Sequence, residues 1–273
     1  MNKIYIIGDI HQNYLPVWNA NKYLNLDSTD TIIFLGDFSG NYYLNKKDKL
    51  FKQKLMDIGA QYFVIRGNHE ERPSLCMERH PAEWHTEYFW CGKVYVENEF
   101  PNIKYALDDP STYVFTCGNK FITMLVLPGA YSVDKYYRLE HGWSWFPMEQ
   151  CDEKERKLGV DLAKSWDNWD LILSHTCPII YEPTDLFLPM VDQSTVDKTT
   201  ERWLGEIEYQ TNYKLWGWGH FHHNRIYPRV DGQDKLMLYN NCLLDIEKYF
   251  NTDNNLYNCL IKIGDNVNID NFL

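Results

Sequence analysis

The chain has 273 residues, of which 44% are hydrophobic, and a formal net charge of −11. This length and apolar content predict a globular protein with a large core. The negative charge disfavours long nucleic acid as a partner, because no basic cluster is segregated along the chain. No apolar run reaches the roughly 18 residues that a membrane span needs, so no membrane association is expected. The seven cysteines form no C-x-x-C pair, which indicates reduced thiols and a cytoplasmic protein.

Short apolar runs typical of buried strands recur along the chain, and most end in a polar or glycine-bearing turn. These runs are residues 4–7, 31–35, 61–65, 121–127, 171–173 and 214–216. Helical spacing at 45–58 and 152–166 alternates with them, which predicts βαβ units and a mostly parallel sheet. Residues 113–127 predict an antiparallel hairpin around Gly118-Asn119. Further runs at 235–239 and 256–263 predict strands of a second sheet packed on the first.

Five turns that directly follow predicted strands carry side chains able to bind a metal ion. In open α/β sheets, ligands bind beyond the carboxyl ends of the strands. Glycines precede several of these side chains, as expected where the backbone turns closely around a site. The turns are Gly8-Asp9-Ile10-His11, Gly36-Asp37, Gly67-Asn68-His69-Glu70, Ser174-His175 and Gly219-His220-Phe221-His222.

Each of these turns also has a purely structural interpretation. Asp9 suits a helix N-cap, Asp37 suits a turn, and His175 suits a hydrogen-bonded position in the core. His220 and His222 alternate in a strand-like segment and are therefore expected to face the same side. The occurrence of all five turns in one chain favours a shared metal site over separate structural roles.

The set Asp-x-His, Gly-Asp, Gly-Asn-His-Glu, His and Gly-His-x-His resembles the calcineurin-like metallophosphoesterases, a superfamily of dinuclear metal hydrolases. The resemblance extends from Gly8 to His222. It implies a four-layered α/β/β/α sandwich of two mixed sheets, with the two metals at the carboxyl-terminal edge of the strands. It also implies a single domain over residues 1–273, because one site draws on both halves of the sequence.

Carried over to this sequence, the family pattern implies two divalent metal ions. Imidazole and carboxylate groups suit Mn, Fe, Zn, Ni or Mg, and manganese is the leading expectation. Two such ions hold a hydroxide for in-line attack on a phosphoester. The resemblance assigns Asp9, His11 and His222 to one ion, Asn68, His175 and His220 to the other, and Asp37 to a position that bridges both.

The resemblance also gives His69 a catalytic role beside the leaving-group oxygen, which a histidine can protonate near neutral pH. A role that only orients Asn68 is the alternative, and Glu70 is expected to support His69. Protein serine/threonine phosphatases carry Gly-Asp-x-x-Asp-Arg-Gly, whereas residues 36–41 are Gly-Asp-Phe-Ser-Gly-Asn. The missing aspartate and arginine disfavour that branch, although Arg-Gly-Asn-His-Glu at 66–70 is typical of it.

Residues 128–150 are predicted to form an active-site loop, because no regular period fits them and loops of this length tend to be functional. The alternative is that the aromatic residues of the loop only pack it onto the sandwich. Arg138, with Lys135 in reserve, is the candidate for binding phosphate in place of the missing arginine. Tyr131 is expected to contact the organic part of the substrate, and Asn68 to assist in binding it.

These expectations describe a metal-dependent phosphohydrolase that cleaves a small phosphomonoester or phosphodiester. Nucleotide-like substrates are favoured, because aromatic side chains can stack on a base. The alternatives are a protein serine/threonine phosphatase, a nuclease and a non-catalytic scaffold with the same fold. A complete ligand set with an intact His69 argues against the scaffold, and the oligomeric state stays open.

Overall fold

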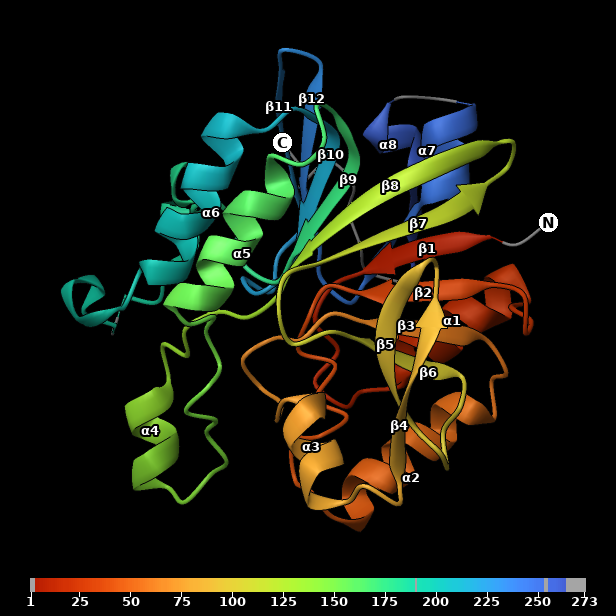
Figure 1. The fold of residues 1–273 in the computed structure, drawn as a ribbon, viewed down its shortest axis with the longest axis vertical. Helices are drawn as coiled ribbons and strands as arrows, with labels where there is room; N and C mark the ends of the chain where they lie inside the picture. Colours follow the sequence, from red (N-terminus) through yellow and green to blue (C-terminus); the bar gives the residue numbers. More distant parts are fainter. Residues whose placement is uncertain (1–2, 190, 253–254, 264–273) are drawn as a thin grey trace.

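A computed structural model describes residues 3–189, 191–252 and 255–263. Two mixed β-sheets pack face to face, and helices cover the outer face of each sheet (Figure 1). Helices α1 (Leu15–Leu24), α2 (Lys46–Met56) and α3 (Pro73–Arg79) lie on the first sheet, and α5 (Glu153–Ala163) and α6 (Thr199–Gln210) lie on the second. The predicted four-layered sandwich is therefore confirmed.

The first sheet has the strand order β14-β13-β1-β2-β3-β6-β5-β4 within the described residues. Its centre is parallel, from β1 through β2 and β3 to β6, and antiparallel strands extend it at both sides. The bounds are β1 (Ile4–Ile7), β2 (Thr31–Phe34), β3 (Gln61–Val64), β4 (Trp84–Phe89), β5 (Gly92–Glu97), β6 (Ile103–Ala106), β13 (Cys242–Asp245) and β14 (Leu260–Lys262).

The second sheet has the order β11-β12-β10-β9-β8-β7 in the part of the chain that the structure describes. Strands β8, β9, β10 and β12 are parallel, and β7 and β11 are antiparallel to their neighbours. The hairpin expected at 113–127 is confirmed as β7 and β8. The bounds are β7 (Ser111–Cys117), β8 (Lys120–Leu127), β9 (Trp169–Ser174), β10 (Tyr213–Trp218), β11 (Arg225–Val230) and β12 (Gln233–Met237).

The central strands are buried on both faces, which explains their nearly continuous apolar sequences. In β1, Ile4 and Ile6 point into the core between the sheets, whereas Tyr5 and Ile7 pack under the helices. Full burial of such side chains contributes about 1.5–3 kcal/mol each. This double burial holds β1, β2 and β3 in register, so the turns that follow them meet at one edge.

Two local expectations are wrong. The run 256–263 is not one strand of the second sheet: α8 (Leu256–Cys259) precedes β14, and β14 pairs with β13 in the first sheet. The Asn255 side chain accepts a hydrogen bond from the Tyr257 N–H at 3.1 Å and caps the helical turn. The loop 128–150 was expected to lack regular structure, but it contains α4 (Lys135–Glu140), which extends away from the sandwich (Figure 1).

The remaining elements are α7 (Ile246–Asn251) and the short 3-10 turns η1 (Ile179–Tyr181), η2 (Thr184–Leu186) and η3 (Gln193–Thr195). Among residues 3–189, 191–252 and 255–263, no helix has the length and apolar character needed to cross a membrane.

Candidate metal centre

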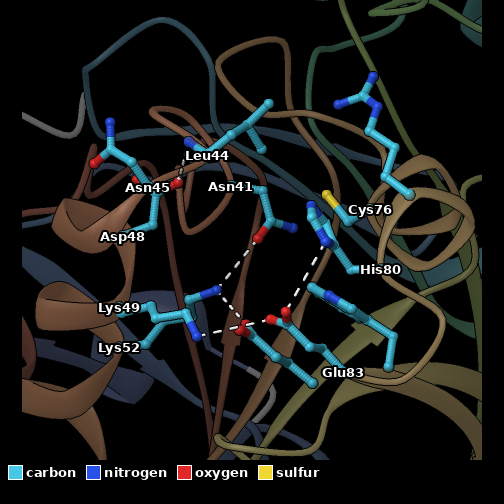
Figure 2. A pocket seen from close by; sticks show the side chains of 12 residues that line it. Asn41, Leu44, Asn45, Asp48, Lys49, Lys52, Cys76, His80 and Glu83 are labelled. Carbon is cyan, nitrogen blue, oxygen red and sulfur yellow. Dashed lines mark hydrogen bonds and ion pairs between the residues drawn. The ribbon is translucent and has the colours of Figure 1, made fainter.

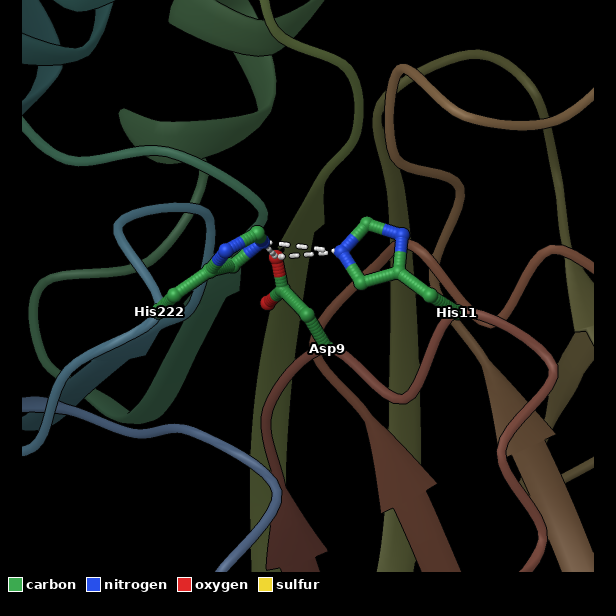
Figure 3. Close-up of side chains that lie close together, drawn as sticks. All are labelled: Asp9, His11 and His222. Atoms are coloured by element: carbon green, nitrogen blue, oxygen red, sulfur yellow. Dashed lines mark hydrogen bonds and ion pairs between the residues drawn. The ribbon is translucent and has the colours of Figure 1, made fainter.

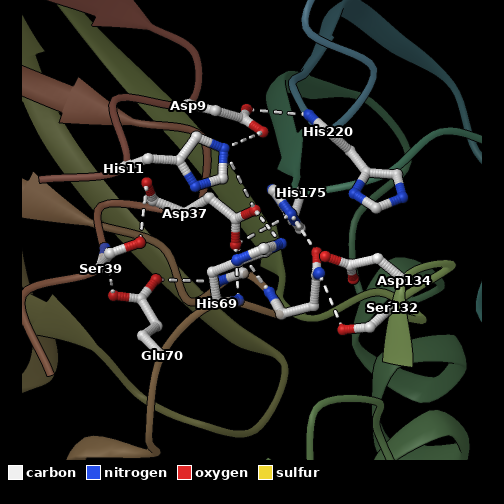
Figure 4. A network of polar contacts seen from close by, with 12 residues as sticks. Asp9, His11, Asp37, Ser39, His69, Glu70, Ser132, Asp134, His175 and His220 are labelled. Carbon is white, nitrogen blue, oxygen red and sulfur yellow. Dashed lines mark hydrogen bonds and ion pairs between the residues drawn. The ribbon is translucent and has the colours of Figure 1, made fainter. Parts of the chain in front are cut away.

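The turns after β1, β2, β3, β9 and β10 converge at one edge of the two sheets (Figure 4). Three groups of side chains there place their ligand atoms within 4.8 Å of one another. All the predicted metal ligands lie at this edge, so the structure brings them together as the parallel topology requires. The three groups are Asp9, His11 and His222; His11, Asp37 and His69; and Asp37, His175 and His220.

The first group surrounds a buried carboxylate. Asp9 Oδ2 lies 3.9 Å from His11 Nε2 and 3.5 Å from His222 Nε2, and these two nitrogens are 2.8 Å apart. Figure 3 shows Asp9 between the two imidazoles. Asp9 is fully buried, and its Oδ2 atom has no hydrogen-bond partner among the described residues. An unpartnered buried carboxylate oxygen is costly, and a divalent cation would satisfy it, so this group fits a metal ion.

Asp37 lies between the first group and the third. Its Oδ1 atom is 3.4 Å from His175 Nε2, and its Oδ2 atom is 3.8 Å from both His11 Nε2 and His69 Nε2. Asn68 Oδ1 is 2.9 Å from His175 Nε2, which adds an amide oxygen beside the third group. The carboxylate of Asp37 therefore has one oxygen toward each group, as a bridging ligand requires.

Charge also favours a cation at this position. Burial opposes the protonation of His175, yet the carboxylates of Asp37 and Asp9 raise the pKa of His175 to about 9. Burial and the adjacent His175 lower the pKa of His220 to about 3. The two buried carboxylates thus attract one positive charge to the cluster, and divalent ions would meet the same electrostatic demand.

The ligand-bearing turns have unusual backbone conformations. His11, Asp37, His220 and His222 have positive φ values of 44°, 45°, 69° and 52°. Such conformations in non-glycine residues cost about 1–3 kcal/mol each and cluster at functional sites. The strand-like alternation expected for His220 and His222 is wrong, since β10 ends at Trp218. Both histidines reach the site through left-handed turn residues instead.

Glycines beside the ligands allow close packing that no other residue permits. A Cβ atom at Gly67 would lie 2.1 Å from Asp37 Oδ1, and one at Gly219 would lie 2.2 Å from Asp9 Oδ1. Contacts this short do not occur between real atoms, so any side chain at either position would displace a carboxylate. The glycines noted in the sequence are therefore explained by the approach of side chains from neighbouring strands.

Hydrogen bonds from surrounding residues orient the ligands. The His175 Nδ1 atom lies 2.7 Å from the Leu35 carbonyl oxygen, and the N–H groups of Asn68 and His69 donate to Asp37 Oδ1, each at 2.8 Å. With Nδ1 held by a carbonyl, the Nε2 atom of His175 is left to face the site.

A buried chain of contacts, not recognised from the sequence, orients Asn68. Its Nδ2 donates to Ser132 Oγ at 3.0 Å, the Ser132 N–H donates to Glu149 Oε1 at 2.9 Å, and Trp145 Nε1 donates to Glu149 Oε2 at 2.9 Å. The Nδ2 contact leaves the Asn68 Oδ1 atom toward His175. The Gly-Ala-Tyr-Ser-Val-Asp segment at 129–134 was the available signal, because its serine supplies the acceptor.

Arg138 is fully buried and lies against His69. The Arg138 Nη2 atom contacts both ring nitrogens of His69 and lies 3.0 Å from Nδ1. The Arg138 Nε atom donates to Asp134 Oδ2 at 2.9 Å. Burial lowers the pKa of His69 to about 4. The Asp37 carboxylate opposes this shift, and the Arg138 guanidinium adds to it. The phosphate-binding role of Arg138 and the catalytic role of His69 stay predictions, and the structure adds a direct contact between them.

Glu70 supports the turns rather than the His69 ring. Its carboxyl oxygens accept hydrogen bonds from the N–H groups of Gly67 at 3.0 Å and Ser39 at 3.2 Å. Burial raises the pKa of Glu70 to about 8. Glu70 therefore connects the turn after β2 to the turn after β3, and both of these turns carry candidate ligands.

Two cavities adjoin the cluster on different sides. The aromatic cavity measures about 540 Å³ and contains two of the site histidines in its wall; it is lined by His11, Gln12, Ser39, Tyr42, Tyr43, Lys47, His69, Gly142, Trp143 and Ser144. The apolar cavity measures about 260 Å³ and has two more site histidines in its wall; it is lined by Tyr131, Val133, Glu182, Leu186, Phe187, Leu188, Val191, Gln193, Val196, Lys198, Glu201, His220, Phe221 and His222.

A third cavity, of about 230 Å³, lies beside α2 and α3, away from the ligands (Figure 2). Two of its lysines pair with glutamates of the same wall: Lys49 Nζ is 3.7 Å from Glu83, and buried Lys52 contacts Glu97. Because its lining includes no predicted metal ligand, this cavity adds nothing to the candidate site.

Both the sequence and the fold resemble those of known proteins. The model of the calcineurin-like phosphoesterase family matches residues 2–224. The fold resembles TT1561 of Thermus thermophilus, with a TM-score of 0.51 at 10% identity over 89% of this chain and 94% of that one.

Two further structures give TM-scores of 0.49. One is the phosphopantetheinyl hydrolase of Mycobacterium tuberculosis, at 14% identity over 96% of this chain and 95% of that one. The other is a dimetal phosphatase from Danio rerio, at 10% identity over 90% and 95%. No curated protein matches the sequence significantly. Since the family model covers most of the chain, the protein belongs to the calcineurin-like phosphoesterases.

Proposed function

We propose that the protein hydrolyses a small phosphoester with the aid of two divalent metal ions, within a single cytoplasmic domain. The observation that carries this proposal is the position of Asp37, whose two carboxylate oxygens face different groups of histidines. The unpartnered Oδ2 atom of buried Asp9 supports it independently. When bound, such ions supply Lewis acidity toward phosphoryl oxygens and activate a water molecule as nucleophile. Manganese is the ion that we expect.

The residues around the cluster suit the other requirements of phosphoester cleavage. His69 lies in the wall of the aromatic cavity, 3.8 Å from Asp37 Oδ2, so a leaving group in that cavity would place its oxygen beside the imidazole. The imidazole can donate a hydrogen bond to that oxygen as the ester bond breaks. Arg138 holds the ring in place and brings positive charge to the same side of the cluster.

A protein serine/threonine phosphatase is less well supported. Residues 36–41 lack the aspartate and arginine of that branch, and the Asn41 carbonyl instead accepts the Glu71 N–H at 3.0 Å within the core of the turn. A non-catalytic scaffold would not need two adjacent buried carboxylates, one with an unpartnered oxygen, left-handed ligand turns or a cavity beside His69. These features are costly unless they serve a reaction.

The decisive experiment combines metal analysis with activity. Wild-type protein should contain divalent metal and should hydrolyse generic phosphoesters, and a chelator should abolish turnover. Asp37→Asn should lose both metal and activity, because the bridging carboxylate contacts both groups. Asp161→Asn makes the same chemical change on the exposed surface of α5 and should leave both properties unchanged. Full activity in chelator, from protein without bound metal, would refute the proposal.

A further inference from the structure

The ligand cluster is open on two sides rather than one. His11 and His69 line the aromatic cavity, whereas His220 and His222 line the apolar cavity, and the two linings share no residue. Asp9 lies between His11 and His222 (Figure 3). A phosphorus atom at the cluster would therefore have room for one substituent in each direction. A monoester has only one organic substituent and would leave one of these cavities unused.

The walls of the two cavities differ in chemistry. The aromatic cavity presents Tyr42, Tyr43 and Trp143, together with the Lys47 ammonium, which lies 4.3 Å from the centre of the Tyr43 ring. Tyr42 stacks beside His69, with ring centroids 6.3 Å apart and planes at 21°. Flat rings and a cation suit a planar group that departs with negative charge. His69 in the same wall marks this cavity as the one for the leaving group.

The apolar cavity is built for a group that stays on phosphorus. Its walls are mainly aliphatic and phenyl side chains, and its rim charges cancel, since Lys198 Nζ lies 2.7 Å from Glu182 Oε1. One buried polar group lines it: Glu201 is 4% exposed, its Oε1 accepts from Thr176 Oγ1 at 2.9 Å, and its Oε2 has no partner among the described residues. Because that oxygen lacks a partner, a ligand donor that reached it from the cavity would satisfy it.

Resting on the proposed function, we infer that the substrate is a phosphodiester with two unlike organic groups. The leaving group occupies the aromatic cavity beside His69. The group retained on phosphorus occupies the apolar cavity, and it has an apolar body with one hydroxyl or amino donor directed to Glu201. Hydrolysis breaks the bond from phosphorus to the leaving oxygen, water supplies the new oxygen, and the products are a free alcohol or phenol and a phosphomonoester of the retained group.

Nitrophenyl esters that share one leaving group test this inference, because only the second substituent then differs. The series is nitrophenyl phosphate and the nitrophenyl diesters whose second group is methyl, phenyl or aminophenyl. Wild-type protein should prefer the phenyl to the methyl diester by at least about tenfold in kcat/KM, the scale on which an apolar pocket discriminates. The aminophenyl diester should exceed the phenyl diester by a further several-fold.

Two variants of the apolar cavity should change these ratios. Phe187→Ala should bring the phenyl-to-methyl ratio toward one, and Glu201→Gln should remove the preference for aminophenyl. Phe121→Ala is the matched control, since this exposed phenylalanine lies outside both cavities, and it should keep both ratios. Val196→Ala, on another segment of the same wall, should also lower the phenyl-to-methyl ratio and replaces Phe187→Ala if that variant does not fold.

The outcomes separate this inference from the proposed function. Efficient hydrolysis of the monoester, with diesters cleaved poorly, would overturn the inference and leave a metal-dependent phosphoesterase. The same holds for a wild-type protein indifferent to the second substituent. A protein that hydrolyses none of these esters with any divalent metal would overturn both.

Discussion

The guanidinium of Arg72 joins the turn after β3 to the end of the loop 128–150. Its Nε donates to the Met148 carbonyl at 2.9 Å, and its Nη2 donates to the Gln150 carbonyl and to Glu155 Oε2, each at 3.0 Å. Nη1 also contacts the other oxygen of Glu155. Because Glu155 belongs to α5 on the second sheet, this ion pair ties the two halves of the sandwich beside the metal centre.

Replacing Glu155 by glutamine removes the charge and one of the two oxygens that accept from Arg72. The side chain of Glu155 also accepts the Asp152 N–H at 2.8 Å as part of the capping box that begins α5, and glutamine can keep that bond. Although burial opposes it, the hydrogen-bonded Arg72 lowers the pKa of Glu155 to about 2 from an ordinary value of 4.5. At 1.36 kcal/mol per pH unit, this difference corresponds to roughly 3 kcal/mol of stability.

The pH dependence of this contribution has a definite sign. A carboxyl group whose pKa is lower in the folded protein stabilises the fold above its unfolded pKa, and the contribution disappears as pH falls toward the folded value. Glu155→Gln should therefore lower the free energy of unfolding by roughly 3 kcal/mol at pH 7 and by roughly 2 kcal/mol at pH 3.5. Equilibrium urea unfolding of both proteins at the two pH values measures the difference.

A neighbouring glutamate supplies the control. Glu153 lies in the same first turn of α5 but is exposed, so Glu153→Gln should change the free energy of unfolding by less than about 0.5 kcal/mol. Equal effects of the two substitutions, or a loss for Glu155→Gln that is the same at pH 7 and pH 3.5, would show that the Arg72 ion pair is not what stabilises this junction.

Two further predictions concern the centre itself. His69→Ala should slow hydrolysis of alkyl esters by about two to four orders of magnitude and of nitrophenyl esters much less, because nitrophenolate departs without a hydrogen bond from the imidazole. Equal losses on both would assign His69 to positioning. Gly67→Ala should lower the metal content of the purified protein, because the new Cβ would lie 2.1 Å from Asp37 Oδ1; elemental analysis with wild-type stoichiometry would contradict this explanation of the glycine.

The central strands could be predicted because burial on both faces leaves a clear apolar signature. The strands β4, β5 and β6 at the side of the first sheet could not be predicted in this way. In β4, Trp84 is buried but His85 and Glu87 are exposed or partly exposed, so the strand reads as polar. It is held by pairing with β5, where Trp84 lies opposite Glu97. Pairing across a sheet is a contact between distant residues, and it leaves little trace in local composition.

The candidate ligands could be anticipated because parallel strands deliver their following turns to one edge. The residues that orient them followed no such rule. Ser132 contacts Asn68 across 64 positions of sequence, and Arg72 reaches Glu155 across 83. A single serine or arginine in an irregular segment belongs to no repeating sequence pattern, so the sequence does not indicate its contact. For the same reason the contact of Arg138 with His69 leaves no mark in the sequence, although the sequence indicates each residue separately.

The centre also joins the two sheets, which links its chemistry to the stability of the fold. Asp9 follows β1 of the first sheet, and its Oδ1 accepts the N–H of His220 from the second sheet at 2.9 Å. Asp9 and Asp37 are both buried, at 0% and 1% exposure, and repel each other. Although burial opposes it, His175 lowers the pKa of both carboxyl groups, so one protonated histidine offsets part of this repulsion. A metal ion would offset the rest, whereas an amide at either position would relieve the repulsion and remove a ligand.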